Sequence, residues 1–547
     1  MRISRLQLRN FKRFTDLTID LSSLQTPPKL VLMIGANGSG KSSLFDAFEW
    51  LTLTKSSPKN DSAYYPKVAG KIIEGEIQFA DGGKIQRTNG AAEVFGALPR
   101  TLFYGRSAFR QVPELTRTSI GGRESVVVND EDRPLRYIHL DQRFENDIDI
   151  LAERIVREIF VDQSFKADEL RERYVAPVNQ ALNRIFNFTP ETAVRLHSIF
   201  PPLQGKPIQL NFQKGQAEIH YDLLSSGEKE VVNILFNLFI RRESYPDTIY
   251  FIDELDVHLN TSLQYNLIKE VAENWIPENC QLWTASHSLG FIQYARESAR
   301  AAILDFDQFD FDYPRTLTPE PKDSLEVYEI AVPKEVALEI FRDKQIILCE
   351  NKNDEFFNLL NLPKKLFVGV QNKDEVCRSI KNNPRFYGLI DRDYLTDNEI
   401  KKIRHRYPNL FVLNFYAFEN YLYHPDNLLE VMPEFDAAAY RQEITHQKNK
   451  LRDNIILNLK QSRNYRILKD ENIEDKTLDA ILEALKSDAF DEFYPLFDMK
   501  GKFDRSSLAK LNLTEDRLAR TTWFLQAIKR VFDDADATSI QQENENQ

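Results

Sequence analysis

The segment that most restricts the fold of this chain is KLVLMIGANGSGKSSLFDAFEW, residues 29–50. An apolar run, a glycine-rich turn and apolar residues at helical spacing predict a buried strand, a tight loop and a helix. Gly35, Gly40, Lys41 and Ser42 have the spacing G-x-x-x-x-G-K-S. In such a loop the backbone N–H groups surround a phosphate, the lysine reaches the outer phosphates and the serine hydroxyl binds Mg²⁺. The segment therefore predicts a nucleotide and Mg²⁺ site formed by Asn37, Gly38, Gly40, Lys41, Ser42 and Ser43.

A second apolar stretch, TIYFIDELD at residues 248–256, ends in two adjacent carboxylates, Asp253 and Glu254. Carboxylates at the end of a buried strand cost free energy unless a cation or hydrogen bonds compensate them. Beside a phosphate-binding loop, Asp253 is expected to hold Mg²⁺ through water. Glu254 is expected to orient or deprotonate the water that attacks the γ-phosphate. The alternative is a strand that runs into an acidic surface turn.

Two further segments place polar residues at the ends of expected helices and strands. LSSGE, residues 224–228, begins an apolar-periodic helix, and Ser and Gly backbone at a helix N-terminus can bind an anion. The same residues are equally compatible with an ordinary helix N-cap. QLWTASHSLGFI, residues 281–292, predicts a short strand followed by Ser286, His287 and Ser288. His287 lies where a sensor of the γ-phosphate is expected.

Together these motifs resemble the ATP-binding-cassette (ABC) ATPases, in the branch that contains RecF, the structural-maintenance-of-chromosomes (SMC) proteins and the OLD (overcoming lysogenisation defect) family. The resemblance covers residues 1–300 and includes the opening ISRLQLRNFKRFTDLTIDL. In that branch the signature serine and glycine complete the nucleotide site of a partner head. The resemblance therefore implies that Ser225 and Gly227 act across a dimer of ATPase heads.

The same resemblance assigns roles to other residues. His287 corresponds to the switch histidine, Asp256 to the loop after the catalytic glutamate, and Gln111 is one candidate for the Q-loop glutamine. Ser226 and Glu228 replace the more usual glycine and glutamine of the signature. The chain has no long heptad array, which argues against the coiled-coil arm of a chromosome clamp.

Length and composition indicate a globular protein of two or three domains. The 547 residues are 42% hydrophobic and 28% charged, and no apolar run approaches the length of a membrane span. The N-terminus alternates charged and apolar residues, unlike a signal peptide, so a cytoplasmic location is expected. Cys280, Cys349 and Cys377 are predicted to be core residues. The net charge of -12 predicts that any contact with nucleic acid is local.

Beyond residue 330, short apolar strands alternate with helices, and several strands end in acids. Glu350 follows KQIILC with Asp354 four residues later, Asp391 and Asp393 follow RFYGLI, and Glu419 follows LFVLNFYAF. Because the carboxyl ends of parallel strands meet at one edge of a sheet, Glu350, Asp391, Asp393 and Glu419 are expected to cluster. Such a cluster is self-repulsive unless Mg²⁺ or Mn²⁺ occupies it, and paired metals suit phosphodiester hydrolysis. Each acid taken singly is also an ordinary turn residue.

This pattern resembles TOPRIM domains, the metal-binding fold of topoisomerases, primases and OLD nucleases, over residues 340–430. The family has Glu-Gly-Lys-x-Asp after one strand and Asp-x-Asp after a later one. At those positions this chain has Glu350, Asn351, Lys352, Asp354, Asp391 and Asp393. Asparagine in the glycine position tolerates left-handed backbone almost as glycine does. The stretches DRDY and NFYAFENYLYHPDNL look most like the divergent TOPRIM domains of bacterial anti-phage systems, such as OLD-like retron effectors and the PARIS system.

The chain is therefore expected to have an α/β fold in three segments. These are a RecF-like ABC ATPase at 1–315 with a helical insertion about 145–200, a TOPRIM-like domain at 325–430, and a mostly helical extension at 431–547. An acidic connector with three prolines, residues 305–324, joins the first two segments. In the extension, residues 441–469 carry eight Lys or Arg against two acids. That segment is either a phosphate-backbone contact or a solvated amphipathic helix.

The two resemblances imply an ATP-regulated, metal-dependent nuclease that acts in anti-phage defence. Its expected catalytic residues are Glu254, Glu350, Asp391 and Asp393, and its expected metal ligands are Ser42, Asp253, Glu350, Asp354, Asp391, Asp393 and Glu419. The expected cofactors are ATP and Mg²⁺, with Mn²⁺ as an alternative at the nuclease site. Expected partners are a second copy of the chain, DNA, and a reverse transcriptase with its msDNA or another defence protein. Two alternatives stay open: cleavage of tRNA or other RNA, and an ATP-driven scaffold that binds nucleic acid without cutting it.

Overall fold

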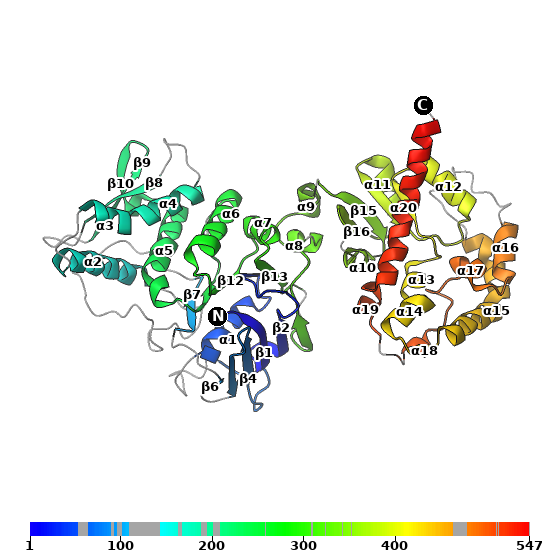
Figure 1. The fold of residues 1–547 in the computed structure, drawn as a ribbon, viewed down its shortest axis with the longest axis horizontal. Coiled ribbons are helices and arrows are strands. Elements are labelled where there is room, and N and C mark those ends of the chain that lie inside the picture. The colour runs from blue at the N-terminus through cyan, green and yellow to red at the C-terminus, as the bar shows by residue number, and fades with distance from the viewer. Residues whose placement is uncertain are drawn as a thin grey trace. The chain divides into compact units, whose positions relative to one another are not determined.

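The computed structural model consists of two compact units, Met1–Lys334 and Glu335–Gln547 (Figure 1). The structure describes residues 1–52, 64–88, 92–95, 101–108, 143–161, 167–186, 194–200, 208–256, 259–307, 310–322, 324–341, 343–351, 353–360, 362–462, 478–509, 511 and 513–545.

The first unit is built on a five-stranded parallel sheet. Its strands lie in the order β13 (Ala301–Asp305), β3 (Leu30–Ile34), β12 (Gln281–Ala285), β11 (Ile249–Ile252) and β7 (Phe103–Arg106). Every residue of the three inner strands is buried, as expected for strands covered on both faces. Because the strands run the same way, their carboxyl ends share one edge, and the predicted nucleotide-binding segments follow β3, β11 and β12 at that edge.

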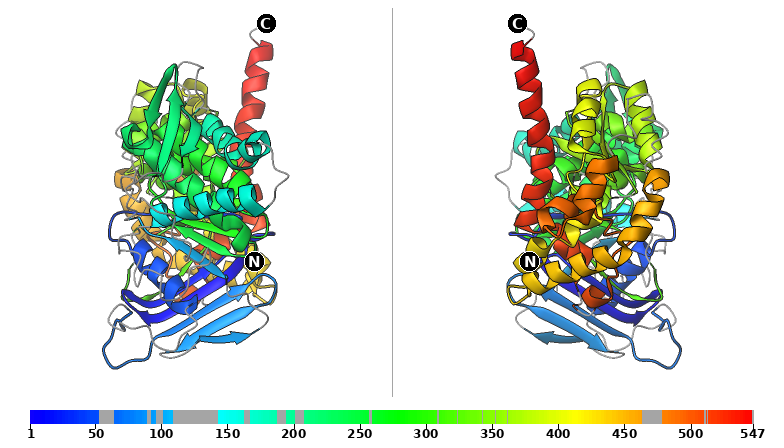
Figure 2. Two further views of the ribbon diagram at one scale, coloured as in Figure 1. Left: turned by 90° about the vertical axis from the view of Figure 1, so that its left-hand side faces the viewer. Right: turned by 90° about the vertical axis from the view of Figure 1, so that its right-hand side faces the viewer.

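A second, mostly antiparallel sheet covers helix α1 (Lys41–Thr52). Its strands are β14 (Pro314–Leu317), β2 (Phe14–Asp20), β1 (Ile3–Phe11), β4 (Glu74–Phe79), β5 (Lys84–Thr88) and β6 (Ala92–Phe95). Figure 2 shows its first strands, in blue, as one layer. A Cβ on Gly75 of β4 would lie 2.7 Å from Leu51 and 2.8 Å from Trp50 of α1, so this close approach needs glycine.

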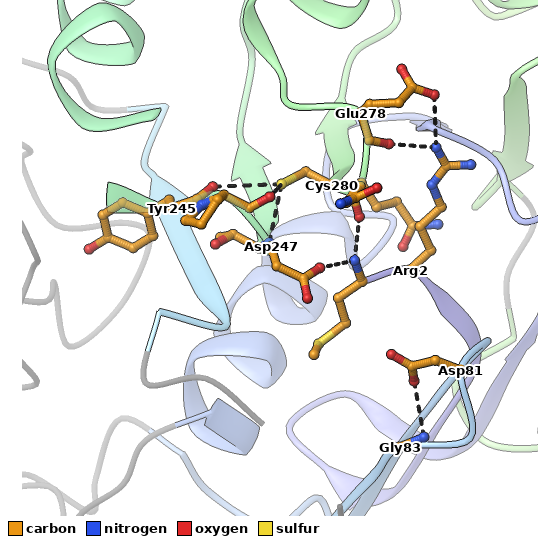
Figure 3. Close-up of polar contacts among 12 residues, drawn as sticks. Arg2, Asp81, Gly83, Tyr245, Asp247, Glu278 and Cys280 are labelled. Carbon is orange, nitrogen blue, oxygen red and sulfur yellow. Dashed lines mark hydrogen bonds and ion pairs between the residues drawn. The ribbon is translucent and has the colours of Figure 1, made fainter. Parts of the chain in front are cut away.

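The start of β1 is tied to the amino-terminal edge of the parallel sheet (Figure 3). The guanidinium of Arg2 donates to the carbonyl oxygens of Pro27 and Glu278, each at 2.8 Å. The amino group of Met1 contacts Asp247, just before β11. Cys280, just before β12, is buried and accepts from the Thr248 N–H at 3.2 Å. These contacts join the two sheets of the first unit into one body.

Helices of the first unit flank the parallel sheet and extend it. They are α2 (Arg143–Val161), α3 (Ala167–Tyr174), α4 (Ala176–Phe186), α5 (Ser226–Arg241), α6 (Thr261–Glu270), α7 (Leu289–Glu297) and α8 (Leu325–Glu329). The insertion expected to be helical over 145–200 ends differently. Val194–Phe200 forms β8, an edge strand of a three-stranded sheet in which the central β9 (Gln209–Lys214) pairs with both β8 and β10 (Ala217–His220). Its VRLHSIF sequence begins with alternating burial, which suits a strand with one covered face.

The second unit contains a four-stranded parallel sheet. Its order is β16 (Lys365–Val370), β15 (Gln345–Glu350), β17 (Phe386–Ile390) and β18 (Leu410–Val412). From β15 the chain passes outward to β16 and then returns to β17 on the other side. The strand order reverses between β15 and β17, and ligands of open α/β sheets bind at the carboxyl end of such a switch point.

The helices beyond residue 430 share a hydrophobic core with this sheet. Phe411 of β18 contacts Phe532 with ring centroids 4.8 Å apart, and Phe418 contacts Phe524 at 5.9 Å. The expected segments 325–430 and 431–547 therefore form one packed body. The helices of this body are α10 (Asp354–Asn358), α11 (Lys373–Asn382), α12 (Asp397–Arg406), α13 (Phe418–Leu422), α14 (Pro425–Val431), α15 (Ala437–Ser462), α16 (Leu478–Lys486), α17 (Phe490–Phe493), α18 (Ser506–Ala509), α19 (Glu515–Ala519) and α20 (Thr522–Glu545), with α9 (Lys334–Ile340) before the sheet.

Within the described ranges, no helix combines the length and the apolar character that crossing a membrane requires. The three cysteines, Cys280, Cys349 and Cys377, are free and buried, which confirms their prediction as core residues. Burial raises the pKa of the Cys280 and Cys377 thiols to about 11. Neither thiol is therefore poised to act as a nucleophile near neutral pH.

Candidate functional site

The phosphate-binding loop of the first unit lies between β3 and α1. Gly35, Gly38 and Gly40 have φ angles of 135°, 85° and 95°, which favour glycine. A Cβ on Gly40 would lie 3.0 Å from the ring of Phe311 and 3.1 Å from that of Phe14, so the third glycine is also required by space. Asn37, Gly38 and Ser42 are exposed, while Ser43 is half-buried. The turn therefore presents backbone and the N-terminus of α1 to a ligand.

Lys41 directs its ammonium group into this loop. Its Nζ donates to the carbonyl oxygens of Gly35 at 2.6 Å and Ala36 at 3.0 Å. Burial lowers the pKa of Lys41, and the nearby charges of Asp253 and Glu254 oppose that shift. A loop with glycine backbone and one enclosed cation fits a polyphosphate, whose oxygens would replace the two carbonyls as partners of Lys41.

Asp253 and Glu254 follow β11 beside that lysine. Asp253 is buried, and its backbone N–H donates to the carbonyl oxygen of Arg106 at 3.0 Å. Glu254 is exposed, donates from its N–H to Ala285 at 3.2 Å and has a φ of 45°. A non-glycine residue in this left-handed region is uncommon and is held by its surroundings. The structure thus separates a buried carboxylate suited to Mg²⁺ from an exposed one that can face water.

Residues after β12 reach the same edge of the sheet. The N–H of Ser286 donates to Met33 of β3 at 3.0 Å, and its hydroxyl donates to Asp256 at 2.8 Å. The N–H of Ser288 donates to the Ser286 hydroxyl at 2.9 Å, and His287 between them is exposed. The histidine is therefore held on a hydrogen-bonded turn next to the β3 end.

The LSSGE segment begins α5 as a capping box. The Ser225 N–H and hydroxyl donate to Glu228 at 2.8 and 2.9 Å, and the Glu228 N–H donates back to the Ser225 hydroxyl at 3.4 Å. Burial opposes ionisation of Glu228, yet hydrogen bonds from Lys214 and Ser225 lower its pKa. Gly227 is buried in the first turn. The N-cap interpretation therefore describes the isolated chain, and action of Ser225 and Gly227 across a dimer stays a prediction.

Two acids at this edge, Asp305 and Asp307, were not among the predicted site residues. The Ala36 N–H of the phosphate loop donates to Asp307 at 3.3 Å, and the Asp307 N–H donates to Asp305 at 2.6 Å. The charges of both carboxylates favour a higher pKa for Lys41, against the effect of its burial. Burial raises the pKa of Asp305 itself. The sequence placed them in a connector. The available signal was AAILD, which is an apolar run ending in an acid, as in IYFID.

In the second unit, Glu350 and Asp391 meet at the switch point. Glu350 ends β15, Asp391 follows the adjacent β17, and the Asp391 N–H donates to the Glu350 carboxylate at 2.6 Å. Only 9% of Glu350 and 7% of Asp391 is exposed, so each charge is poorly solvated. Burial first, and then the proximity of other carboxylates, raises the pKa of both residues. Sequence reasoning predicted this juxtaposition from the strand ends.

Asp393 and Lys373 form an ion pair at the same edge. The Lys373 ammonium contacts the Asp393 carboxylate and donates to the Asp391 carbonyl at 2.9 Å. Asp393 has a φ of 50°, and its N–H donates to the carbonyl oxygen of Tyr416 at 2.8 Å. Sequence reasoning missed Lys373 because it starts α11, well away from the acidic motifs along the chain. The lysine brings positive charge to a predominantly acidic edge.

Glu419 and Asp354 lie differently from one another. Glu419 pairs with Lys500 at 3.7 Å, while its other oxygen is buried without a hydrogen-bond partner among the described residues. The charge of Glu419 contributes to raising the pKa of Asp391. Asp354 instead lies against Gly369 of β16, where a Cβ would come within 2.5 Å of its carboxylate. Since β16 and β17 flank β15 on opposite sides, Asp354 is on the side of β15 away from Asp391.

The donor chemistry of this edge fits a hard divalent cation. Three acids supply carboxylate oxygens there: Glu350, Asp391 and Glu419. The pKa is raised at Glu350 and Asp391. One carboxylate oxygen of Glu419 is buried and has no hydrogen-bond partner among the described residues. Within the described ranges, no three acidic, histidine or cysteine side chains already surround one metal position. The lysines paired with Asp393 and Glu419 balance part of the charge instead.

Three predictions lie partly or wholly outside the described residues. Gln111 and Lys352 are outside them, as is the end of the basic segment from residue 463. In the described part of that segment, Lys448 is fully buried and donates to the carbonyl oxygens of Leu485 and Ser487 at 3.2 and 2.6 Å. Lys448 therefore serves the packing of the helices and is not placed to contact a phosphate backbone.

Comparison with known proteins finds one family model and two relatives that match part of the chain. Residues 5–192 match the family model described as an AAA domain. The chain is 26% identical over 247 residues to the chromosome partition protein Smc of Bordetella petrii, covering 42% of this chain and 19% of that protein. It is 35% identical over 96 residues to the DNA replication and repair protein RecF of Carboxydothermus hydrogenoformans, covering 18% of this chain and 24% of that protein. The chain thus spans no more than a quarter of the length of these relatives.

Two solved structures also align with part of the chain. The SMC head domain from Thermotoga maritima aligns with a TM-score of 0.32 at 16% identity, over 59% of this chain and 100% of that chain. An Smc head domain with an extended coiled coil, derived from Pyrococcus furiosus, aligns with a TM-score of 0.30 at 14% identity, over 56% of this chain and 93% of that chain.

The family model covers the phosphate loop and helix α1. The carboxylates that act on the pKa of Lys41 follow β11 or lie at the end of β13, at the same edge of the sheet. The comparisons are therefore consistent with the predicted ATPase: residues 5–192 match an AAA domain, and the chain is similar in part to Smc and to RecF.

Proposed function

We propose that the chain is an ATP-regulated, metal-dependent nuclease of the OLD kind, acting in the cytoplasm in anti-phage defence. The observation that carries the nuclease half is the contact between Glu350 and Asp391 at the switch point of the second sheet. The Asp391 N–H donates to the Glu350 carboxylate, so two buried carboxylates lie close together at this point. Such carboxylates repel each other unless a proton or a cation intervenes. The proposal also rests on the resemblance to OLD nucleases, and it takes DNA as the substrate.

In the ATPase half, residues at the edge of the first sheet would share the work. Lys41 and the loop N–H groups would bind the phosphates, Ser42 and Asp253 would hold Mg²⁺, and the exposed Glu254 would orient the attacking water. When bound, Mg²⁺ would supply positive charge that offsets the charge of the phosphates. Ser225 and Gly227 of a second copy would close the site, which makes the working unit at least a dimer.

In the nuclease half, Glu350, Asp391 and Glu419 would hold Mg²⁺ or Mn²⁺, and Asp393 would join them on leaving Lys373. The ion would supply a Lewis acid for hydrolysis of a phosphodiester. Lys373 and Lys500 would then be released to pair with phosphate oxygens of the substrate. The two lysines lie at the same edge as the acids, so the substrate backbone and the carboxylates can meet there.

A second candidate function is favoured by one observation. Among the described residues, no set of three acids already surrounds a metal position. The carboxylate of Asp393 is paired with the ammonium group of Lys373. A domain of this kind could bind a partner or nucleic acid without cutting it, so that the chain would work as an ATP-driven scaffold. RNA is the third possibility, because carboxylate-held metals act on the phosphodiester and not on the sugar.

One experiment separates these functions. Purified parent, Glu350→Gln and Lys41→Ala proteins are assayed for ATP hydrolysis and for cleavage of linear DNA, circular DNA and tRNA with Mg²⁺ or Mn²⁺. Glu350→Gln should keep ATP hydrolysis and lose at least about 100-fold in cleavage, because it removes a buried charge at the metal position. Lys41→Ala should lose nucleotide binding by roughly 10- to 100-fold, the worth of a charge-assisted hydrogen bond.

Glu355→Gln is the matched control, since Glu355 is exposed in α10, a few residues beyond Glu350. It should behave as the parent in both assays. Cleavage by Glu350→Gln at the rate of the parent would refute the nuclease site. Failure of the parent to cut any substrate with either metal, together with ATP hydrolysis that depends on Lys41, would establish the scaffold instead. Cleavage confined to tRNA would establish the RNA alternative.

A further inference from the structure

A cleft of about 100 Å³ opens beside the carboxyl end of β18 in the second unit. Asn414 and Phe415 line it from the segment after β18, and Trp523, Gln526 and Arg530 line it from α20. Tyr421 and Ala527 complete the lining, so its walls combine three aromatic rings, two carboxamides, one guanidinium and one methyl group. This composition differs from that of the apolar core nearby, and none of these residues was part of a predicted site.

The aromatic side of the cleft is a rigid stack. Trp523 lies on His424 with ring centroids 4.3 Å apart and planes 18° apart. Phe415 stacks on His424 at 5.6 Å and 20°. Burial lowers the pKa of His424 to about 4, so the imidazole is neutral at physiological pH and the stack carries no charge. The rings are therefore held in place before any ligand arrives, which reduces the entropy lost on binding.

The polar side of the cleft has unused hydrogen-bonding groups. Gln526 and Arg530 are exposed and one helical turn apart on α20. Their side chains, and the carboxamide of Asn414, have no hydrogen-bond partner among the residues that the structure describes. A carboxamide offers both a donor and an acceptor in one plane, as the edge of a nucleobase does, and a guanidinium suits a phosphate.

The cleft and the acidic edge are connected through one short segment of chain. The Asn414 carbonyl accepts from Arg392 at 2.8 Å, between Asp391 and Asp393 in the sequence. The Tyr416 carbonyl accepts from the Asp393 N–H at 2.8 Å. The N–H of Phe418 donates to the Asp391 carboxylate at 3.2 Å. Residues 414–418 therefore line the cleft at one end and contact the carboxylates at the other.

We propose that this cleft binds an unpaired nucleobase of the strand whose phosphodiester reaches Glu350 and Asp391. The inference rests on the proposed nuclease function and adds a preference for single-stranded, looped or frayed nucleic acid. Bases within a duplex are stacked and paired, so they cannot present a face to Trp523 and an edge to Gln526. A stacking platform beside a phosphate-binding guanidinium is a common means of holding single strands without regard to sequence.

The test measures binding separately from cleavage. Short labelled DNA and RNA oligonucleotides are titrated with the 547-residue chain in the presence of a chelator. Fluorescence anisotropy reports the affinity for single strands, for the matching duplex and for a strand with abasic positions. Trp523→Ala should weaken binding of the single strand by roughly 5- to 150-fold, the range for loss of one stacked base. Binding of the duplex should not change. Trp523→Phe should keep most of the affinity, because it retains an aromatic face.

Two further variants protect the test against a folding defect at Trp523. The pair Gln526→Ala and Arg530→Glu alters exposed groups only, and should weaken single-strand binding without changing thermal stability. Tyr407→Ala is the control, because Tyr407 precedes β18 at the opposite end of that strand. It should bind like the parent. The DNA and RNA arms show which sugar the cleft accepts.

The outcomes are distinguishable from failure of the nuclease proposal. Equal affinity of the parent for the abasic and the intact strand, or unchanged affinity in both the Trp523 and the Gln526 and Arg530 variants, overturns the cleft. Loss of single-strand affinity in those variants supports it. If the parent cuts nucleic acid through Glu350 but prefers duplex, the nuclease stands and the cleft falls. If single strands bind through Trp523 but are never cut, the nucleobase site stands and the nuclease falls.

Discussion

At the scale of the residue, buried carboxylates dominate the chemistry of the second unit. Glu350 and Asp391 are almost wholly buried and share one hydrogen bond, while Lys373 and Lys500 lie against neighbouring acids. Burial raises the pKa of both buried acids. An acid whose folded pKa is raised binds more protons in the folded than in the unfolded state above about pH 4. Folding is therefore opposed as these groups are forced to ionise.

The raised pKa values of Glu350 and Asp391 predict how the stability of the second unit depends on pH and on bound metal. In a chelator, the unfolding temperature of the second unit should fall as pH rises from about 5 to about 8, because the free energy of unfolding decreases wherever the folded state holds more protons. Mg²⁺ should restore it at the higher pH by favouring the ionised acids. Asp391→Asn should flatten both dependences relative to Glu355→Gln. Differential scanning calorimetry of the full chain measures this, and equal slopes in the two variants would contradict it.

At the scale of the element, helix and strand ends do most of the positioning. The predicted strands of both sheets end at the acids and at the phosphate loop, and Glu254, Asn351 and Asp393 adopt left-handed backbone at three of those ends. The φ of 58° at Asn351 agrees with the tolerance expected of asparagine in the usual glycine position. Such backbone is retained where surrounding contacts enforce it, and it redirects the chain immediately after a strand.

One helix end supplies a test of packing. Lys448 of α15 is fully buried, donates to the last carbonyls around α16 and lies 4.7 Å from the ring of Phe493. Lys448→Met should destabilise the second unit by about 1–3 kcal/mol, because it removes the Lys448 donor from one buried carbonyl, that of Leu485, and one partly buried carbonyl, that of Ser487. Lys450→Met, at an exposed position of the same helix, should change stability little. Chemical denaturation followed by tryptophan fluorescence compares them, and equal midpoints would show that Lys448 has no such role.

At the scale of the whole molecule, the chain joins a unit that contains the match to an AAA domain to a second α/β unit. The proposed regulation requires two copies, because the α5 N-terminus of one head would complete the nucleotide site of the other. In the isolated chain the capping box of Ser225 and Glu228 already satisfies that helix start. ATP would therefore have to compete with, or add to, an existing set of hydrogen bonds.

A variant that binds ATP without hydrolysing it tests this assembly. Glu254→Gln should bind ATP as the parent does and lose hydrolysis by at least about 100-fold, because the attacking water is no longer activated. With ATP and Mg²⁺ its mass in light scattering should double. Adding Ser225→Arg should abolish the doubling by blocking the helix start, whereas Ser22→Arg, at an exposed site, should not. A monomer of Glu254→Gln at micromolar concentration with saturating ATP would contradict the dimer.

Local patterns were sufficient for the features that depend on contiguous residues. The phosphate loop needs only its own spacing and the strand before it, and the acids after β11, β15 and β17 follow from apolar runs that end in carboxylates. The parallel arrangement then brings those ends to one edge whatever the strand order. For this reason the amino-acid sequence alone sufficed to pair Lys41 with Asp253, and Glu350 with Asp391.

Only the tertiary structure decided which other groups join them. Asp307 reaches the phosphate loop because β13 lies beside β3, and Asp354 is separated from Asp391 because β16 and β17 flank β15 on opposite sides. Lys373 and Lys500 reach the acids from segments far away in the sequence, and the helices after residue 430 complete the core of the second sheet. These outcomes depend on strand order and on packing between distant segments, which no local periodicity encodes.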